Sequence, residues 1–507
     1  MGWTVGLAGV VVAVGVCLVF WPVLSVEALH ADDHDYVIHN VLVRNPGWAS
    51  AERFFGEVLE PSTVGGYYHP LSMVSLMVDC AMGASPQNLR PFHRTSLILH
   101  AGNSALIVVL IYLLVGRVWA AVLVGLLFGV HPLGVESVAW IGERKNLLAA
   151  FFGLGSLIGY VLFVGRSSRG WLVASVGLFG ISLLAKPTTL PLPILLLLLD
   201  YWPMNRLGRR AVLEKVPYLV LAAASAMVTL ISQGRTAGWT DADRSVVDTL
   251  LVLCHNLAFY PLKILWPAGL SSHYPLPDGL SITDATVVAG LIGAMLVTGV
   301  LVFSLRRTRA LLVGGLFFWV GIFPALGVVG FTDVIAADRF TYFPMVGLLL
   351  ALGWAMVLAK RTAVIRLVVA GALLAVSAEA WATRKYLVHW KDTASLYQHM
   401  IATAPEVADL RWTLCNHFLL KGQPEAALPE CQEAVRLAPD ALEAQTNLGN
   451  TLSALGRLDD AVGHFEAALS LDEASAVTHN DLGALLAKRT DLAGAVGQQC
   501  SQVVMRD

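Results

Sequence analysis

The chain has 507 residues, of which 56% are hydrophobic and 14% are charged, and its formal net charge is −2. Soluble proteins average about 45–50% apolar and about 25% charged residues, so the composition excludes a single water-soluble globule. It also excludes a disordered chain, because disorder needs low hydrophobicity and high net charge. A net charge near zero offers no electrostatic footprint for nucleic acid, so we expect no nucleic-acid partner.

Charged residues are more frequent near the C-terminus. They make up 26 of the last 124 residues but only 44 of the first 383. The sequence therefore predicts two parts, an apolar membrane domain over residues 1–383 and a tail of ordinary soluble composition. The six cysteines are scattered and include no C-x-x-C pair, which indicates neither a zinc site nor a disulfide framework.

Apolar segments close to the length of a membrane span recur along the first part. A helix needs about 20 apolar residues to cross the bilayer core. Eleven segments meet or approach that length: Trp3–Leu24, Thr95–Val115, Val118–Val135, Leu147–Val164, Trp171–Ala185, Thr189–Trp202, Val212–Ile231, Ala285–Leu305, Leu311–Gly330, Phe340–Leu358 and Ala363–Ala382. Trp171–Ala185 and Thr189–Trp202 are short for a full crossing. The predicted fold class is all-α, a polytopic membrane protein followed by an α-helical tail.

Two segments have alternative interpretations. Trp3–Leu24 has features of a signal peptide, but no Lys or Arg precedes it and its apolar run exceeds the usual core of about 7–15 residues, so we expect a retained span. A twelfth stretch, Leu250–Trp266, carries His255, Asn256 and Lys263, and we expect an interfacial or re-entrant helix there. With eleven spans every tight basic cluster faces one side, which predicts a cytoplasmic N-terminus and an extracytoplasmic tail.

The tail repeats with a period of 34 residues, which is the tetratricopeptide period. The repeated positions form columns of like residues: Leu414, Leu448 and Leu482; Phe418, Leu452 and Leu486; Ala427, Ala461 and Ala495. The sequence predicts a connector with a half repeat over 384–407 and three units, Ala408–Ala441, Leu442–Ser475 and Ala476–Asp507. A solenoid needs a polar cap on its last face, so either the array ends on the membrane domain or the sequence is truncated.

Two cysteines occupy packing positions of the first repeat unit. Cys415 and Cys431 either approach each other or act as two small core hydrophobes, and we favour the second interpretation.

Ionisable side chains of the membrane domain gather in loops that this topology places outside. The long loop 25–94 contains Asp32 and Asp33, adjacent carboxylates that raise each other's pKa and that we expect on a loop rather than in a packed core. Later outer turns add further candidates: His131, Glu136, Glu143, Arg144, Lys145, Asn146, Lys186, Asp333, Asp338 and Arg339. A helix cap or a snorkelling charge explains each residue alone equally well, so the interpretation depends on their shared side.

These residue types suggest group transfer at the membrane surface. Carboxylates suit activation of an acceptor hydroxyl or binding of a divalent metal, and Arg and Lys suit a phosphate. A transporter would place ionisable residues near the middle of its helices, so loop positions favour surface chemistry over transport. Because nucleotide-activated donors are made in the cytoplasm, a transfer outside it needs a donor anchored to lipid.

At these residues the sequence resembles membrane glycosyltransferases of the GT-C fold. It is most similar to the tetratricopeptide-bearing protein O-mannosyltransferases of the TMTC family and their bacterial relatives. The matching stretches follow the family order over nearly the whole chain: His30 to Asp33, Asn40, Asn45 and Pro46, Tyr68–Ser72, His93, Leu97–Asn103, His131–Ile141, Arg144–Leu148, Lys186 and Ala337–Pro344. The chain departs from the family pattern at Pro187 and Asn146, where acidic residues are common.

The resemblance implies an inverting transferase that uses a polyprenyl- or dolichyl-phosphate sugar, often mannose, with Ser or Thr hydroxyls of a protein as acceptors. Asp32 and Asp33 carry the catalytic role by this resemblance, either as general base or as ligands of a divalent metal such as Mg or Mn. The implied donor and phosphate site is a larger set: His69, Glu136, Arg144, Lys145, Lys186, Asp338 and Arg339. The repeats would hold the acceptor protein.

Two other functions remain open at this point. A lipid-linked polysaccharide ligase or polymerase would share the topology and the basic outer residues, but it needs neither the Asp pair nor the repeats. A non-enzymatic membrane scaffold would use the repeats to recruit partner proteins. We expect the protein in a bacterial inner membrane, or in the ER membrane if the source is eukaryotic, with its repeats extracytoplasmic.

Overall fold

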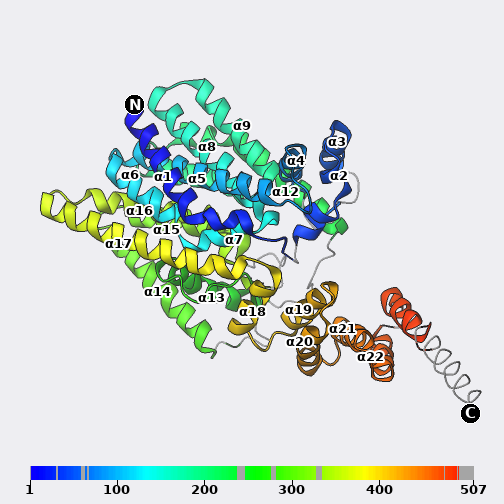
Figure 1. Cartoon of the computed structure of the whole chain (residues 1–507). Helices are drawn as coiled ribbons and strands as arrows, with labels where there is room; N and C mark the ends of the chain where they lie inside the picture. Colours follow the sequence, from blue (N-terminus) through cyan, green and yellow to red (C-terminus); the bar gives the residue numbers. More distant parts are fainter. Residues whose placement is uncertain are drawn as a thin grey trace, which may run out of the picture. The chain divides into compact units, whose positions relative to one another are not determined.

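The computed structural model describes residues 2–29, 32–58, 63–64, 68–236, 246–275, 281, 283–326, 334–472, 474–487 and 489. The chain divides into two compact units, Met1–Lys391 and Asp392–Asp507 (Figure 1). The boundary falls later than the predicted residue 383, because the last helix of the first unit continues to Leu387. His30 and Asp333, named among the candidate residues, lie outside the described residues.

The first unit is built from helices, with one small antiparallel sheet. Its α-helices are α1 (Trp3–Phe20), α2 (Val41–Arg44), α3 (Trp48–Gly56), α4 (Pro70–Ala81), α5 (Arg90–Val115), α6 (Val118–Gly129), α7 (Val135–Ala139), α8 (Arg144–Arg166), α9 (Arg169–Ala185), α10 (Leu192–Tyr201), α11 (Arg209–Leu213), α12 (Val216–Thr236), α13 (Val246–Leu265), α14 (Ala285–Ser304), α15 (Ala310–Ile322), α16 (Met345–Val357) and α17 (Thr362–Leu387). Short helical turns are η1 (Trp21–Ser25), η2 (His34–Ile38), η3 (Pro132–Gly134), η4 (Ile141–Glu143), η5 (Pro187–Thr189), η6 (Phe323–Ala325), η7 (Asp338–Thr341) and η8 (Val388–Trp390). The strands are β1 (Tyr274–Pro275) and β2 (Val334–Ala336).

Six helices of the described residues are long and apolar enough to cross a membrane. They coincide with six of the predicted spans and have the bounds Trp3–Ser25, Arg90–Val115, Ile141–Arg166, Arg209–Ser232, Val287–Ser304 and Thr362–Trp390. A seventh predicted span corresponds to a helix pair, Val118–Gly129 and Pro132–Ala139, which is bent by 54°. An all-α membrane protein is thereby confirmed.

The other four predicted spans are shorter helices. They are Arg169–Ala185, Pro187–Tyr201, Ala310–Ala325 and Met345–Val357, all of 10–17 residues. At 1.5 Å per residue, even the longest is shorter than a bilayer core of about 30 Å. Prolines contribute to the short length of two of these helices, since Pro191 and Pro344 directly precede the first residues of α10 and α16. The count of eleven crossings therefore stays a prediction.

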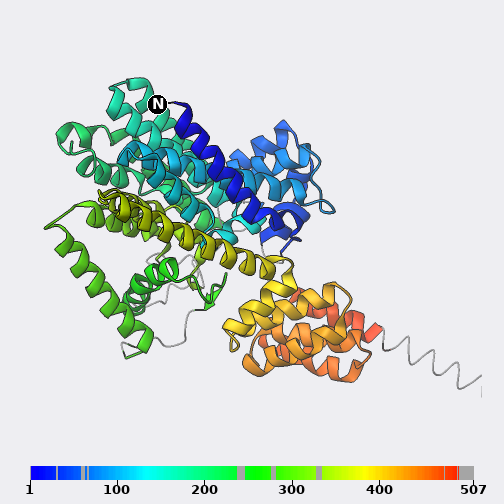
Figure 2. The same ribbon diagram turned by 60° about the vertical axis from the view of Figure 1, so that its left-hand side comes forward.

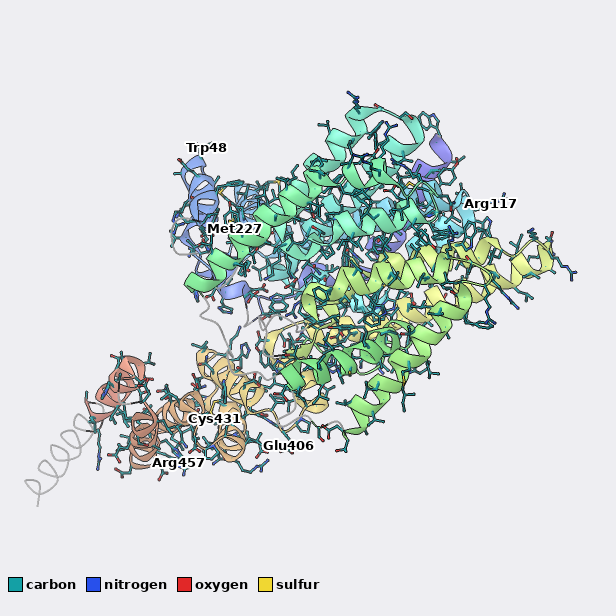
Figure 3. The ribbon with its side chains drawn as sticks, turned by 180° about the vertical axis from the view of Figure 1, so that it is seen from behind. Trp48, Arg117, Met227, Glu406, Cys431 and Arg457 are labelled. Atoms are coloured by element: carbon teal, nitrogen blue, oxygen red, sulfur yellow. A yellow bond between two sulfur atoms is a disulfide. The ribbon has the colours of Figure 1, made fainter. Side chains whose placement is uncertain are left out.

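The spans pack closely around α5 and α8. Helix α5 contacts α1, α6 and α8, and α8 contacts α9 (Figure 1). Small residues allow such approaches, as they do in membrane proteins generally. Between α15 and α16, a Cβ added to Gly314 would lie 2.6 Å from the carbonyl oxygen of Gly347. Two ends of this unit are visible in Figure 3, where Trp48 of α3 lies far from Arg117 after α5.

The long loop between the first two long spans folds into a layer of its own. Helices α2, α3 and α4 enclose a small apolar core that includes Tyr36, Phe54, Met73 and Phe92. Ile141 of η4 belongs to the same core. The loop is therefore anchored on the turn that leads into α8, which places Asp32 and Asp33 beside that turn.

The second unit consists of helix pairs: α18 (Thr393–Thr403), α19 (Ala408–Leu420), α20 (Pro424–Leu437), α21 (Leu442–Ala454) and α22 (Leu458–Leu471) (Figure 2). Helices α21 and α22 begin 34 residues after α19 and α20, so the helix bounds follow the period of the sequence. Residues 476–487 are helical too, and 491–507 of the predicted third repeat lie outside the described residues.

Small residues allow the helices of each pair to approach. A Cβ on Gly449 would come within 2.8 Å of the Phe465 ring. The turn between the helices of each pair contains a glycine with positive φ, Gly422 at 69° and Gly456 at 79°. Cys415 and Cys431, which the sequence suggested were two small core hydrophobes, are joined as a disulfide with their Cα atoms 5.4 Å apart.

Candidate active site

Asp33 is a buried residue held by the backbone. Its side chain has no exposed surface. One carboxylate oxygen accepts a hydrogen bond from the backbone N–H of Leu29 at 3.0 Å, and the other accepts from Gly142 at 2.8 Å. Burial raises the pKa of Asp33 to about 7, although the two backbone N–H groups oppose the shift. The expectation that both Asp side chains lie outside a packed core is therefore wrong for Asp33.

Asp32 differs from its neighbour in exposure and in partner. Its side chain is 41% exposed, and its Oδ2 lies 2.9 Å from the Nζ of Lys145. Burial raises the pKa of Asp32, but the Lys145 ammonium outweighs this effect, so the pKa lies below its usual value. Asp32 is therefore an ionised carboxylate that a molecule outside the protein is able to reach.

A glycine in the turn before α8 allows Asp32 to come this close. A Cβ built on Gly142 would lie 2.8 Å from the Cβ of Asp32 and 3.4 Å from its Oδ2. The same Gly142 donates its N–H to Asp33. One residue of η4 therefore positions both carboxylates.

Glu143 lies at the centre of a group of three cations. Its carboxylate is 3.0 Å from Lys186 Nζ, 3.6 Å from Lys145 Nζ and 3.5 Å from Arg339 Nε. The three cations come from α8, from the turn after α9 and from η7, so Glu143 joins segments far apart in the sequence. Sequence reasoning placed Glu143 in an outer turn but did not include it in the site, although its position beside Lys145 was a signal.

Glu136 pairs with Arg339, the third of these cations. Its Oε2 accepts the backbone N–H of Arg339 at 2.7 Å, and its Oε1 lies 2.5 Å from Arg339 Nη1. The side chains of Arg339 and Lys186 remain 15% and 11% exposed. Burial lowers the pKa of Lys186 to about 8, although Glu143 opposes the shift. These two cations are the partly accessible ones of the cluster.

The structure brings four of the seven predicted donor-site residues together, namely Glu136, Lys145, Lys186 and Arg339. Asp338 is the neighbour of Arg339 in the chain and accepts a hydrogen bond from the hydroxyl of Tyr274 at 2.8 Å. His69 contacts the cluster indirectly, through Tyr36. Its ring lies 5.3 Å from the ring of Tyr36, whose hydroxyl accepts a hydrogen bond from Lys145 at 3.1 Å.

Arg144 is the predicted donor-site residue that the structure places elsewhere. Its guanidinium is fully buried and lies 2.9 Å from Asp79 of α4. It also donates to the Phe92 carbonyl and the Ser96 hydroxyl. All its contacts join α4 and α5 to α8, so Arg144 supports the outer loop and does not face the cluster around Glu143.

The Asp pair does not have the arrangement of a metal site. Both oxygens of Asp33 accept backbone N–H groups, and Asp32 is paired with an ammonium group rather than with a third ligand. Among the residues that the structure describes, no group of three or more His, Cys, Asp or Glu side chains is placed to hold a metal ion. The donor groups at the Asp pair therefore do not fit a divalent cation.

The geometry defines a polytopic α-helical membrane protein with a compact ion-pair cluster beside one accessible carboxylate. No known family profile matches the chain. It is 24% identical over 435 residues to the human protein O-mannosyl-transferase TMTC4, covering 74% of this chain and 58% of that protein. Against human TMTC1 the identity is 23% over 495 residues, with 85% and 55% covered, and against human TMTC2 it is 26% over 234 residues, with 42% and 28% covered.

These similarities confirm the resemblance drawn from the motifs, since this chain is similar to TMTC protein O-mannosyl-transferases over much of its length. It spans less than two thirds of the length of these relatives.

Proposed function

We propose that the protein is a GT-C-type glycosyltransferase that moves a sugar of the mannose type from a polyprenyl- or dolichyl-phosphate to a protein Ser or Thr hydroxyl. The observation that carries this proposal is the position of Asp32, a reachable carboxylate paired with Lys145 at the edge of the cluster around Glu143. The names of the homologous proteins support transfer to protein.

Asp32 is the general base in this proposal, and Asp33 is a positioning residue. A base must first be within reach of the proton that it takes, and its pKa matters second. Asp33 has the pKa nearer to neutral, but it is buried and both of its oxygens already accept hydrogen bonds. Asp32 is ionised and exposed, so the acceptor hydroxyl approaches this carboxylate.

In the transfer, the acceptor oxygen forms a bond to the anomeric carbon of the sugar while the bond from that carbon to the phosphate oxygen breaks. The acceptor proton passes to Asp32, and the phosphate leaves with the electron pair. Lys186 and Arg339, the partly exposed cations, are suited to hold the phosphate through charge-assisted hydrogen bonds. Attack from the side opposite the phosphate inverts the anomeric configuration.

In this proposal the 34-residue helix pairs are tetratricopeptide repeats. They hold the acceptor protein on the extracytoplasmic face. The first unit crosses the membrane eleven times. Helix bounds that recur at 34 residues support the repeat assignment. The polysaccharide ligase and the scaffold are less well supported, because neither accounts for the carboxylate beside the cations.

The deciding experiment is sugar transfer by the purified full chain in lipid nanodiscs. The donor is radiolabelled polyprenyl-phosphate mannose, and the acceptors are Ser/Thr peptides or a lipid-linked glycan. We expect labelled peptide with the wild type and a loss of about 10²–10⁴-fold with Asp32→Asn, the usual contribution of a general base.

The matched control is Asp35→Asn, which changes an exposed carboxylate of η2 three residues after Asp32 and should keep the activity of the wild type. Labelled glycan without labelled peptide would favour the ligase, and no transfer by a folded wild type would favour the scaffold.

A further inference from the structure

A groove lies between α14, α15 and α16. It is at the ends of these helices that are farther from the candidate active site. Helix α16 starts a few residues after Asp338 and runs away from it for 13 residues, which is about 20 Å. Leu358, the residue after α16, lines the groove together with residues of α14 and with Leu311 of α15. The three helices are labelled in Figure 1. The groove has no lining residue in common with the cluster around Glu143.

The groove has the dimensions and the polarity of a lipid site. Its volume is about 630 Å³, within the usual range of about 300–1,000 Å³ for small-molecule pockets. Along α14 the lining is apolar from Met295 to Phe303. The polar lining residues, Ser304, Arg307 and Thr308, all lie at the end of α14 or just beyond it. An apolar groove with one polar end matches an acyl chain attached to a polar headgroup.

The charge at that end is positive. The carboxylates of the segment that contains Tyr201, Asp200 and Glu214, are already paired with Lys215 and Arg206. Arg307 is exposed and has no ion-pair partner among the described residues. Two neighbouring arginines stack on aromatic rings, Arg306 over Phe303 and Arg309 over Tyr201. The sequence has no Asp or Glu over 285–332 or 339–378, the segments that contain α14 to α16 and the start of α17. A negatively charged headgroup therefore complements this end of the groove.

We infer that this groove binds an anionic phospholipid of the surrounding membrane, with an acyl chain along α14 and the phosphodiester at Arg307. Basic pockets between membrane helices bind anionic headgroups in this way. The site is independent of the proposed transferase activity, because it lies at the other end of α16 and needs none of the residues assigned to the transfer.

Two glycines allow a matched test. Gly299 lines the groove, and a Cβ added there would meet no atom within 4 Å, so Gly299→Leu fills the groove without a clash at the Cβ. Gly371 of α17 is equally open but does not line the groove, so Gly371→Leu is its control. Arg307→Gln removes the headgroup partner, and Arg169→Gln changes an exposed arginine at the start of α9 that does not line the groove.

The full chain and these variants are placed in nanodiscs of phosphatidylcholine containing a minor fraction of phosphatidylglycerol, and retained lipid is measured by native mass spectrometry. We expect one phosphatidylglycerol retained in preference to phosphatidylcholine. Retention should be lost in Gly299→Leu, should fall about fivefold in Arg307→Gln, and should be unchanged in both controls.

Equal retention of the two lipids, or equal behaviour of Gly299→Leu and Gly371→Leu, would overturn the inference, since the groove would then hold only ordinary bilayer lipid. Displacement of phosphatidylglycerol by an equimolar polyprenyl phosphate would also overturn it and would assign the groove to the donor lipid.

Discussion

Replacing Gly142 by Ala tests the proposed role of Asp32 without removing any functional group. The added Cβ would lie 2.8 Å from the Cβ of Asp32 and 3.1 Å from Trp140 Nε1, whereas ordinary contacts begin near 3.4 Å. Asp32 must therefore move by about 0.6 Å or more, or the turn itself must shift. A displacement of about 1 Å in a reacting group costs up to about 10²-fold in rate, so we expect kcat to fall between about 10- and 100-fold.

The stability cost of this substitution is expected to be modest. Overpacking typically costs about 1–3 kcal/mol, so the variant should still insert and fold. The control is Gly177→Ala on α9, where an added Cβ meets no atom within 4 Å. Both variants are compared in the peptide transfer assay and by thermal unfolding. A folded Gly142→Ala protein with the kcat of the wild type would refute Asp32 as the base.

Three further predictions concern other parts of the molecule. If Lys186, with its pKa of about 8, binds phosphate as an ammonium group, activity should decline as the pH rises through 8, and Lys186→Arg should shift this decline to higher pH; an unchanged profile would argue against phosphate binding there. Asp79→Asn leaves Arg144 buried without its counter-charge and should cost about 3–5 kcal/mol, seen as a lower unfolding midpoint, whereas an unaltered midpoint would mean that the pair is not structural. Deletion of 408–507 should reduce transfer to protein more than hydrolysis of the donor lipid, and equal losses would make the repeats purely structural.

The parts of the fold that depend on local periodicity were predictable from the sequence. The helix pairs of the second unit recur at 34 residues, and six spans were found from runs of apolar residues. Apolar composition alone did not predict the length of each helix. Helices α15 and α16 are as apolar as the six long helices but have 13 residues each.

The site was predictable as a set of residues but not as a set of contacts. Arg144 and Lys145 are adjacent in the sequence, and both were expected at the donor site. Consecutive residues of a helix point about 100° apart, so Arg144 turns to Asp79 while Lys145 turns to Asp32. The role of Glu143 was missed for a different reason, since two of its three partners, Lys186 and Arg339, come from segments that no local pattern connects to it.

The charge balance of the cluster fits the proposed reaction. The cluster has three cations, Lys145, Lys186 and Arg339, and each lies beside an acidic side chain. A sugar phosphodiester carries one negative charge, and the phosphate that leaves carries two. As the phosphate gains this charge, Asp32 takes a proton and loses its own. In the proposed reaction Lys145 then loses its nearer partner, Asp32 at 2.9 Å, and keeps Glu143 at 3.6 Å while a new anion forms. Interactions that strengthen only as the reaction proceeds accelerate it, so in the proposed reaction the attraction of Lys145 for the departing phosphate, rather than its pair with Asp32, acts on the transfer step.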